Sequence, residues 1–186
     1  NDGEIAVNWA LAGHGIVMRA EWDIAKYLQS GRLVQVLENY QTPPAEKARR
    51  FEALSAKAHE VAQSFPQHSE PLVWEGIVLS SWAGERGGLG ALALVKEAKS
   101  VYEKAIAMDG QALEGSAYAS LGVLYYKVPG WPIGFGDKKK ASELLRQALV
   151  INPDGIDPNF FYAEYLVETR HADEAVPYLE RALQAL

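Results

Sequence analysis

The sequence predicts a mainly α protein, in which residues 46–186 form an α-solenoid behind a short α/β-type segment at residues 1–45. Three observations predict this fold class. A pattern of small residues recurs three times at helical spacing. Glycine and proline separate apolar segments that have the length of helices. Hydrophobic residues make up 48% of the 186 residues and charged residues 23%, which is enough apolar material for a packed core.

The recurring pattern is a small residue in a first helix, followed by two alanines seven residues apart in a second helix. Seven residues are about two helical turns, so each alanine pair lies on one face and lets two helices approach closely. The three sets are Gly76, Ala98 and Ala105; Gly122, Ala141 and Ala148; and Ala163, Ala175 and Ala182. Large side chains in the same register are expected to fill the grooves between helices: Tyr102 and Ile106, Leu145 and Leu149, Leu179 and Leu183.

These signals predict a leader helix that caps the array and three helix pairs. Pro66 and Gly110 punctuate the chain, and Asp137 and Asp157 are candidate N-caps, with Pro158 in the first helical position. The predicted helices span residues 44–64, 69–83, 89–108, 112–127, 137–151, 158–169 and 172–185.

Two of the turns inside the helix pairs are longer than the third. Relative to the last pair, the first carries an insertion around residues 82–89 and the second an insertion at residues 128–137, with the sequence VPGWPIGFGD. Both insertions are rich in glycine or proline, so both are predicted to be loops.

The second copy carries the most complete set of motif residues: Leu121-Gly122, Tyr125, Ala141, Ala148-Leu149 and Pro153. In type and spacing these residues resemble the tetratricopeptide repeat. The resemblance implies stacked helix pairs with a concave face that binds a partner. The third copy departs from the pattern, because Ala163 stands where the family prefers glycine.

The VPGWPIGFGD insertion and the long first turn also resemble a narrower group, bacterial tetratricopeptide proteins related to the T component of tripartite (TRAP) transport systems. That resemblance implies a periplasmic or lipid-anchored protein that assembles as an oligomer and passes small solutes alongside a binding protein. On this reading the chain is periplasmic, and without it a cytoplasmic location is expected.

Residues 1–45 follow a helix, strand, helix, strand order, with strand-like runs at 16–18 and 33–37. The stretches Ala10 to Ile16 and Ser30 to Val34 resemble part of the effector-binding domain of LysR-type transcription regulators. The resemblance implies an alternative function, a fragment of a ligand-sensing regulator fused to a repeat domain near Tyr40 to Pro44. An incomplete sheet exposes strand edges, so this segment is expected either to pair with a second chain as a homodimer or to dock on the leader helix.

Composition argues against several kinds of chemistry. The chain has no cysteine, a net charge of −6, and no basic run longer than Lys138 to Lys140, so neither thiol chemistry nor nucleic-acid binding through this chain alone is expected. No apolar run has the length of a membrane span. Gly88, Gly90 and Ala93 match a loose dinucleotide fingerprint, but a helix precedes them where that fingerprint needs a strand.

The ionisable side chains form no recognisable constellation. The four histidines lack metal-ligand spacing, and Glu164, Glu168 and Glu174 fit a solvated helix face better than an acid–base pair. We therefore expect no catalytic residue, metal or cofactor. The sequence predicts a non-enzymatic protein-interaction or transport-accessory scaffold.

The aromatic insertion at residues 128–137 is the candidate functional feature. Its side chains Trp131, Ile133 and Phe135 need burial, which leaves two alternatives. They cover the end of the repeat core, or they line a surface for a protein, a peptide or a small solute. In the second alternative the surface also includes Tyr125, Tyr126, Phe160, Phe161 and Tyr162.

Overall fold

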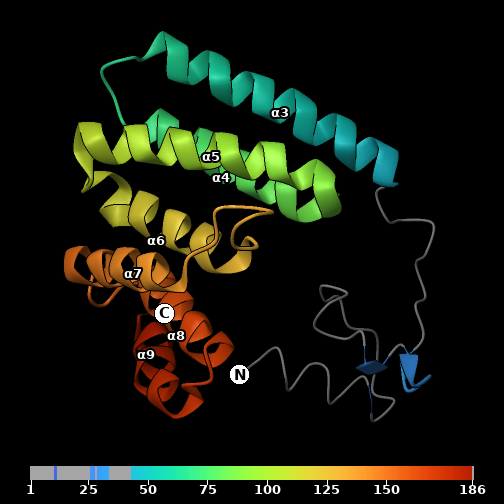
Figure 1. The fold of residues 1–186 in the computed structure, drawn as a ribbon, viewed down its shortest axis with the longest axis vertical. Coiled ribbons are helices and arrows are strands. Elements are labelled where there is room, and N and C mark those ends of the chain that lie inside the picture. The colour runs from blue at the N-terminus through green and yellow to red at the C-terminus, as the bar shows by residue number, and fades with distance from the viewer. Residues whose placement is uncertain (1–10, 12–25, 28, 34–42, 186) are drawn as a thin grey trace. The chain divides into compact units, whose positions relative to one another are not determined.

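The fold was analysed in a computed structural model, which describes residues 11, 26–27, 29–33 and 43–185. The chain divides into two compact units, residues 1–43 and residues 44–186. The second unit is helical throughout its regular structure (Figure 1), which confirms the predicted fold class, a mainly α tetratricopeptide-like array. Its helices are α3 (Pro44–Ser64), α4 (Glu70–Arg86), α5 (Gly88–Asp109), α6 (Ala112–Lys127), α7 (Lys138–Ile151), α8 (Ile156–Glu168) and α9 (Ala172–Gln184).

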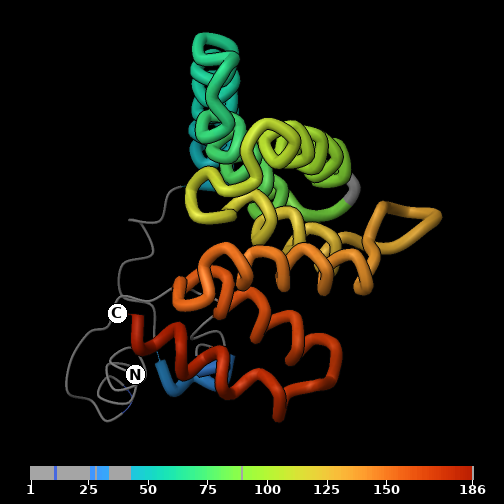
Figure 2. Tube along the Cα trace, turned by 90° about the vertical axis from the view of Figure 1, so that its left-hand side faces the viewer, coloured from blue at the N-terminus to red at the C-terminus, as the bar shows by residue number. Residues whose placement is uncertain are grey.

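The helices pack as three consecutive pairs, α4 with α5, α6 with α7, and α8 with α9. The leader helix α3 packs on α4, and the first helices of the pairs, α4, α6 and α8, also contact one another in sequence. The pairs follow one another along the stack in both views (Figures 1 and 2). This order is the predicted leader helix followed by three helix pairs.

The small residues lie where the helices of a pair approach most closely. The six alanines of the second-helix pairs are all buried: Ala98, Ala105, Ala141, Ala148, Ala175 and Ala182. A Cβ on Gly76 would lie 2.5 Å from a ring carbon of Tyr102, so the first pair leaves no room for a side chain at this position. The small residues of the repeat pattern therefore lie at the sites of close helix packing.

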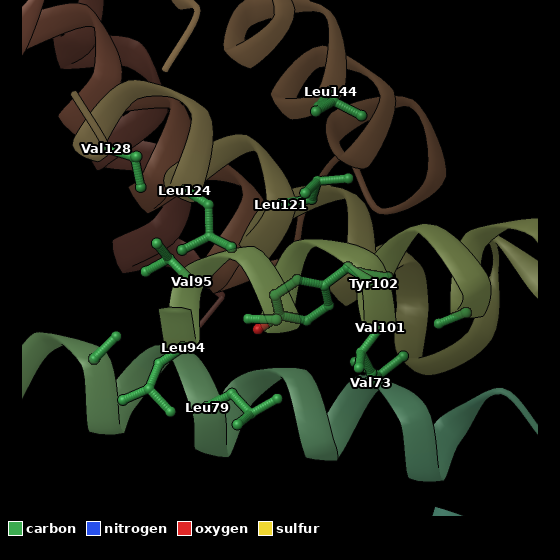
Figure 3. Close-up of a cluster of buried hydrophobic side chains, with 14 residues drawn as sticks. Val73, Leu79, Leu94, Val95, Val101, Tyr102, Leu121, Leu124, Val128 and Leu144 are labelled. Carbon is green, nitrogen blue, oxygen red and sulfur yellow. The ribbon is translucent and has the colours of Figure 1, made fainter. Parts of the chain in front are cut away.

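The first core cluster joins the first two pairs (Figure 3). Tyr102 of α5 is fully buried in it, with Val73 and Leu79 of α4 on one side and Leu121 and Leu124 of α6 on the other. Burial raises the pKa of the Tyr102 hydroxyl, which lies 3.2 Å from the hydroxyl of Ser80. A second cluster joins α6 to α9 and contains Tyr126, Ala141, Leu145, Tyr162, Ala163, Leu166 and Ala175.

The insertion at 82–89 does not form the predicted loop. Helix α4 continues through Arg86, and α5 begins at Gly88, so the added residues lengthen both helices. Gly87 and Gly88 make the turn between them, with φ of 59° and 58°, in the left-handed region that glycine adopts without strain. The insertion at 128–137 does form a loop, as predicted.

The two predicted N-caps have different outcomes. Asp137 caps α7, because its side chain accepts hydrogen bonds from the N–H groups of Lys139 and Lys140 at 2.9 and 3.1 Å. The prediction for Asp157 is wrong, since α8 begins at Ile156 with Gly155 in the N-cap position. A proline is tolerated within the first turn, because the N–H groups there have no intrahelical partner, so the helix can start two residues before Pro158.

In the first unit, the helical residues 26, 27 and 29 end at Gly31, which has a φ of 69°. The N–H of Ser30 donates to the carbonyl of Lys26 at 3.2 Å. These residues agree with the second helix of the predicted helix, strand, helix, strand order. The strand-like runs at 16–18 and 33–37 lie outside the described residues except for Leu33, which forms a bend, and the predicted pairing of this segment is not described either.

Candidate interaction surfaces

The eight aromatic and aliphatic residues predicted to form one surface lie in three environments. Tyr126 and Tyr162 are buried in the second core cluster. Tyr125, Phe135 and Phe161 are half-buried, and Trp131, Ile133 and Phe160 are exposed. The structure therefore does not gather all eight on one surface. Tyr126 and Tyr162 in particular belong to the core, where their rings pack between helices.

The base of the 128–137 loop is fixed to the array. The Phe135 ring meets the Tyr125 ring edge-on at a centroid distance of 5.4 Å, and it packs against the first core cluster. The N–H of Gly136 donates to the carbonyl of Pro129 at 2.9 Å, and the N–H of Asp137 donates to the carbonyl of Tyr125 at 2.8 Å. A Cβ on Gly136 would lie 1.9 Å from the Val128 carbonyl oxygen, so the two sides of the loop cross too closely for any side chain.

The apex of the same loop points outward, and Figure 2 shows the loop projecting from one edge of the stack. Trp131 is 90% exposed and Ile133 is 58% exposed. The first alternative therefore holds for Phe135, while the second stays a prediction for the residues of the apex. Phe135 covers the core, whereas Trp131 and Ile133 form an apolar tip in contact with solvent.

A polar cluster ties α6 to α8 beside the buried tyrosines. The Tyr126 hydroxyl donates to Glu164 Oε2 at 2.5 Å, and Lys127 pairs with Glu164 at 3.0 Å and with Glu168. Burial, reinforced by Glu164, raises the pKa of the Tyr126 hydroxyl and keeps it protonated. Glu164 and Glu168 thus serve an interhelical bridge, in addition to facing solvent as the sequence suggested.

A second tie joins α7, α8 and α9. Arg146 Nε donates to the Tyr162 hydroxyl at 3.0 Å, and the Tyr162 ring packs edge-on against Tyr178 at a centroid distance of 4.8 Å. The polar atoms of the second cluster are thereby used to hold the last two pairs together.

An apolar stripe on α9, formed by Val176, Leu179 and Leu183, was not identified as a surface from the sequence. Helical spacing places the three side chains on one face, next to the face that Ala175, Tyr178 and Ala182 bury against α8. Leu179 is 39% exposed, whereas Tyr102 and Leu145, in the same register of the earlier pairs, are 0% exposed. The prediction that Leu179 and Leu183 fill a groove is wrong, because no further helix of the described chain covers them.

Two clefts lie between helices. One, of about 340 Å³, lies between α3, α4 and α5, where His59 Nδ1 is 2.6 Å from the buried Glu75 carboxylate. The other, of about 240 Å³, lies where the α5–α6 and α7–α8 junctions meet. There Leu113 and Glu114 take left-handed φ values of 48° and 55°, and Asn152 Nδ2 donates to Glu114 at 2.6 Å.

Neither a candidate metal centre nor a membrane-spanning helix occurs among the described residues. No group of three or more histidine, aspartate or glutamate side chains is arranged to hold a metal ion. None of the described helices combines the length and hydrophobicity needed to cross a bilayer.

Comparisons with known proteins give short or distant likenesses. No family model matches the chain. A 40-residue stretch is 58% identical to the HTH-type transcriptional activator TtdR of Escherichia coli K12, and covers 22% of this chain and 13% of TtdR. The HTH-type transcriptional regulator DmlR of the same strain is 49% identical over 43 residues, which is 14% of DmlR. The chain thus spans about one seventh of these regulators, and the match supports the resemblance of one segment to the LysR type. Among solved structures, MamA aligns with a TM-score of 0.39 at 19% identity, over 78% of this chain and 95% of that one.

Proposed function

We propose that the chain is a non-enzymatic scaffold that binds an amphipathic helix of a partner protein at the open end of its repeat array. The observation that carries this proposal is the exposed stripe on α9. Each earlier second helix buries the corresponding position between the first helix of its own pair and the pair that follows, whereas α9 leaves the same position partly exposed to solvent. An apolar helix face that another helix covers elsewhere in the array is a suitable docking site for a partner helix.

The internal repeats indicate what kind of helix would fit. Tyr102 of α5 shares a cluster with Ala117 and Leu121 of α6, and Leu145 of α7 shares one with Ala163 and Leu166 of α8. In both cases the covering helix supplies a small residue and a leucine four or three residues later. A partner helix with this apolar spacing would cover Leu179 in the same way.

The charges beside the stripe add a second requirement. Helical geometry places Asp173 and Glu180 next to the stripe, on the side away from α8, and both are exposed. A partner helix with basic residues along one flank of its apolar face would pair with them. Such rim charges contribute to selectivity and association rate more than to affinity.

The proposal is tested by replacing Leu179 and Leu183 with lysine in the full chain. The control is Val150→Lys, which places a lysine on an exposed apolar position of α7. Proteins that co-purify with the wild type and the control, and are absent with the double variant, would support docking on α9. An unchanged set of bound proteins with the double variant, after circular dichroism confirms its fold, would rule this site out.

A narrower role as a transport accessory is supported by the 128–137 loop, the segment whose sequence resembles the T component of tripartite systems. On this proposal the protein is periplasmic and acts with a solute-binding protein. Cell fractionation of the protein expressed from its own gene tests the location. Recovery with cytoplasmic markers alone would contradict the transport role and leave docking on α9 untouched.

The alternative, a fragment of a ligand-sensing regulator, is supported by the 40-residue match to TtdR. A LysR-type sensor binds its effector in a two-lobed pocket, and the matched stretch is a small part of the regulator. Deleting residues 1–45 and measuring small-molecule binding by thermal shift tests this role. Binding that survives the deletion would exclude it.

A further inference from the structure

The apolar side chains of the 128–137 loop lie in two different environments. Phe135 turns inward onto Tyr125 and the core, so the loop has a buried site for an aromatic ring. Trp131 nevertheless stands 90% exposed at the apex, and Ile133 is exposed beside it. Hydrogen bonds fix the base of the loop, so the apex is exposed in one defined conformation.

Part of the backbone at the apex is hydrogen-bonded within the loop and needs no water as a partner. Pro132 has no N–H, and the N–H groups of Ile133 and Gly134 both donate to the Gly130 carbonyl, at 3.2 and 3.1 Å. Below the apex, the N–H of Gly136 is bonded to the Pro129 carbonyl. Unbonded backbone groups are the main obstacle to moving a loop into an apolar phase, and most donors of this apex are already satisfied.

Positive charge follows the loop directly. Lys138, Lys139 and Lys140 form the first turn of α7, and all three are exposed. The positive end of the helix dipole disfavours cations there, so their placement has an energetic cost to the fold. Lys140 pairs with Glu143 at 3.5 Å, while no ion pair involves Lys138 or Lys139 among the described side chains.

The acidic side chains around the loop base have other partners. Asp137 accepts the N–H groups of Lys139 and Lys140, and Glu164 and Glu168 are paired with Lys127. Lys138 and Lys139, directly after the base of the loop, therefore carry charges that remain available to a partner.

We propose that this loop docks the protein on an anionic lipid surface, with Trp131 and Ile133 entering the headgroup region and Lys138 and Lys139 contacting anionic headgroups. Tryptophan favours this region because its ring is amphipathic, and lysines beside a negatively charged leaflet add attraction. A lipid surface accepts a convex apolar tip without a complementary pocket. The N–H groups of Ile133 and Gly134 are already bonded within the loop and are not offered to a protein groove, which favours lipid as the surface that receives the apex. This activity is separate from helix docking on α9.

The test is flotation of the full chain with vesicles of equimolar phosphatidylglycerol and phosphatidylcholine, beside vesicles of phosphatidylcholine alone. The wild type is expected to float with the anionic vesicles, and less so at high salt. Trp131→Ala with Ile133→Ala should lower the bound fraction by at least about tenfold, because the apex supplies most of the apolar area that leaves water. Lys138→Glu with Lys139→Glu should remove the preference for anionic vesicles.

The matched control is Trp74→Ala, which removes an exposed tryptophan of α4 and should leave flotation unchanged. Thermal melts establish that each variant is folded. The proposal is overturned if the wild type floats with neither vesicle type, as expected for a loop that serves a protein pocket or a second copy. It is also overturned if the apex variant floats like the wild type, or if Trp74→Ala lowers flotation equally. None of these results bears on the partner set lost in the Leu179 and Leu183 variant, so the two proposals fail separately.

Discussion

Gly122 and Leu145 meet across the second helix pair so closely that a Cβ on Gly122 would lie 2.7 Å from Leu145 Cγ and 3.3 Å from the Leu145 backbone nitrogen. A backbone atom cannot move aside as the end of a side chain can. The contact therefore fixes the distance between α6 and α7, and with it the position of the loop that connects them.

Gly122→Leu is expected to destabilise the array by about 1–3 kcal/mol or more, because it overpacks this contact. Chemical denaturation followed by circular dichroism measures the change. Gly84→Ala is the matched control, since a Cβ there meets nothing within 4 Å and alanine favours a helix. The control should be neutral or stabilising by roughly 0.5–1 kcal/mol. A Gly122→Leu melt equal to that of the wild type would mean that the helix register is wrong.

Gly136→Ala is expected to break the base of the 128–137 loop, because its Cβ would collide with the Val128 carbonyl oxygen. The array itself should remain folded, since the collision involves only loop backbone. Limited proteolysis should show new cleavage within 128–137 and unchanged protection elsewhere. Equal protection of the loop in the variant and the wild type would contradict the close crossing.

Asp137→Ala is expected to cost about 1 kcal/mol, because it removes the side chain that caps α7. Three lysines follow the cap, so the loss is not compensated by acidic residues in the first turn. Asp137→Asn supplies the comparison, since asparagine caps about as well as aspartate. If the alanine variant were as stable as the asparagine variant, the cap would contribute nothing.

Tyr126→Phe is expected to reduce the loss of stability at alkaline pH. The folded-state pKa of Tyr126 is raised, so the unfolded chain loses this proton first, above pH about 10. Stability from the protonated hydroxyl is complete below that pH and declines as the pH rises toward the folded-state value. Urea midpoints at neutral and alkaline pH measure the effect. Tyr102, whose pKa is also raised, should leave a residual slope in the variant. A slope as steep as that of the wild type would contradict the assignment.

The N-terminal segment leads to a prediction about assembly. The sequence predicts strand edges at 16–18 and 33–37, so residues 1–45 are expected to pair with a second chain. Light scattering should show a dimer for the full chain and a folded monomer for residues 46–186. A full chain that stays monomeric at high concentration would exclude pairing, and unfolding of the truncated chain would make the segment a cap of the array.

Helix positions followed closely from the sequence because local signals determine them. The leader helix at 44–64 and the helix at 112–127 have the predicted bounds, and Asp137 caps α7 as expected. The insertion at 82–89 was misassigned, because Glu85 and Arg86 favour helix and the two glycines alone suffice for the turn. Glycine content alone does not indicate where a loop begins.

The candidate surface was harder to predict, because burial depends on which neighbours the fold supplies. Tyr126 and Tyr162 are as aromatic as Trp131, yet α6, α7, α8 and α9 enclose them, while Trp131 projects from the stack. Leu179 matches Tyr102 and Leu145 in register, but the helix that would cover it is absent from the described chain.

The two ends of the array differ in the surface that they present. At one end, α3 faces outward with charged side chains, among them Arg49, Arg50 and Lys57, and closes the first pair. At the other end, α9 offers an apolar strip at the position where each earlier helix receives the next one. Proteins added by the same packing rule would extend the stack from the α9 end, which presents this uncovered apolar face among the described helices. The array would then gain partners at one end of the stack, and not at both ends.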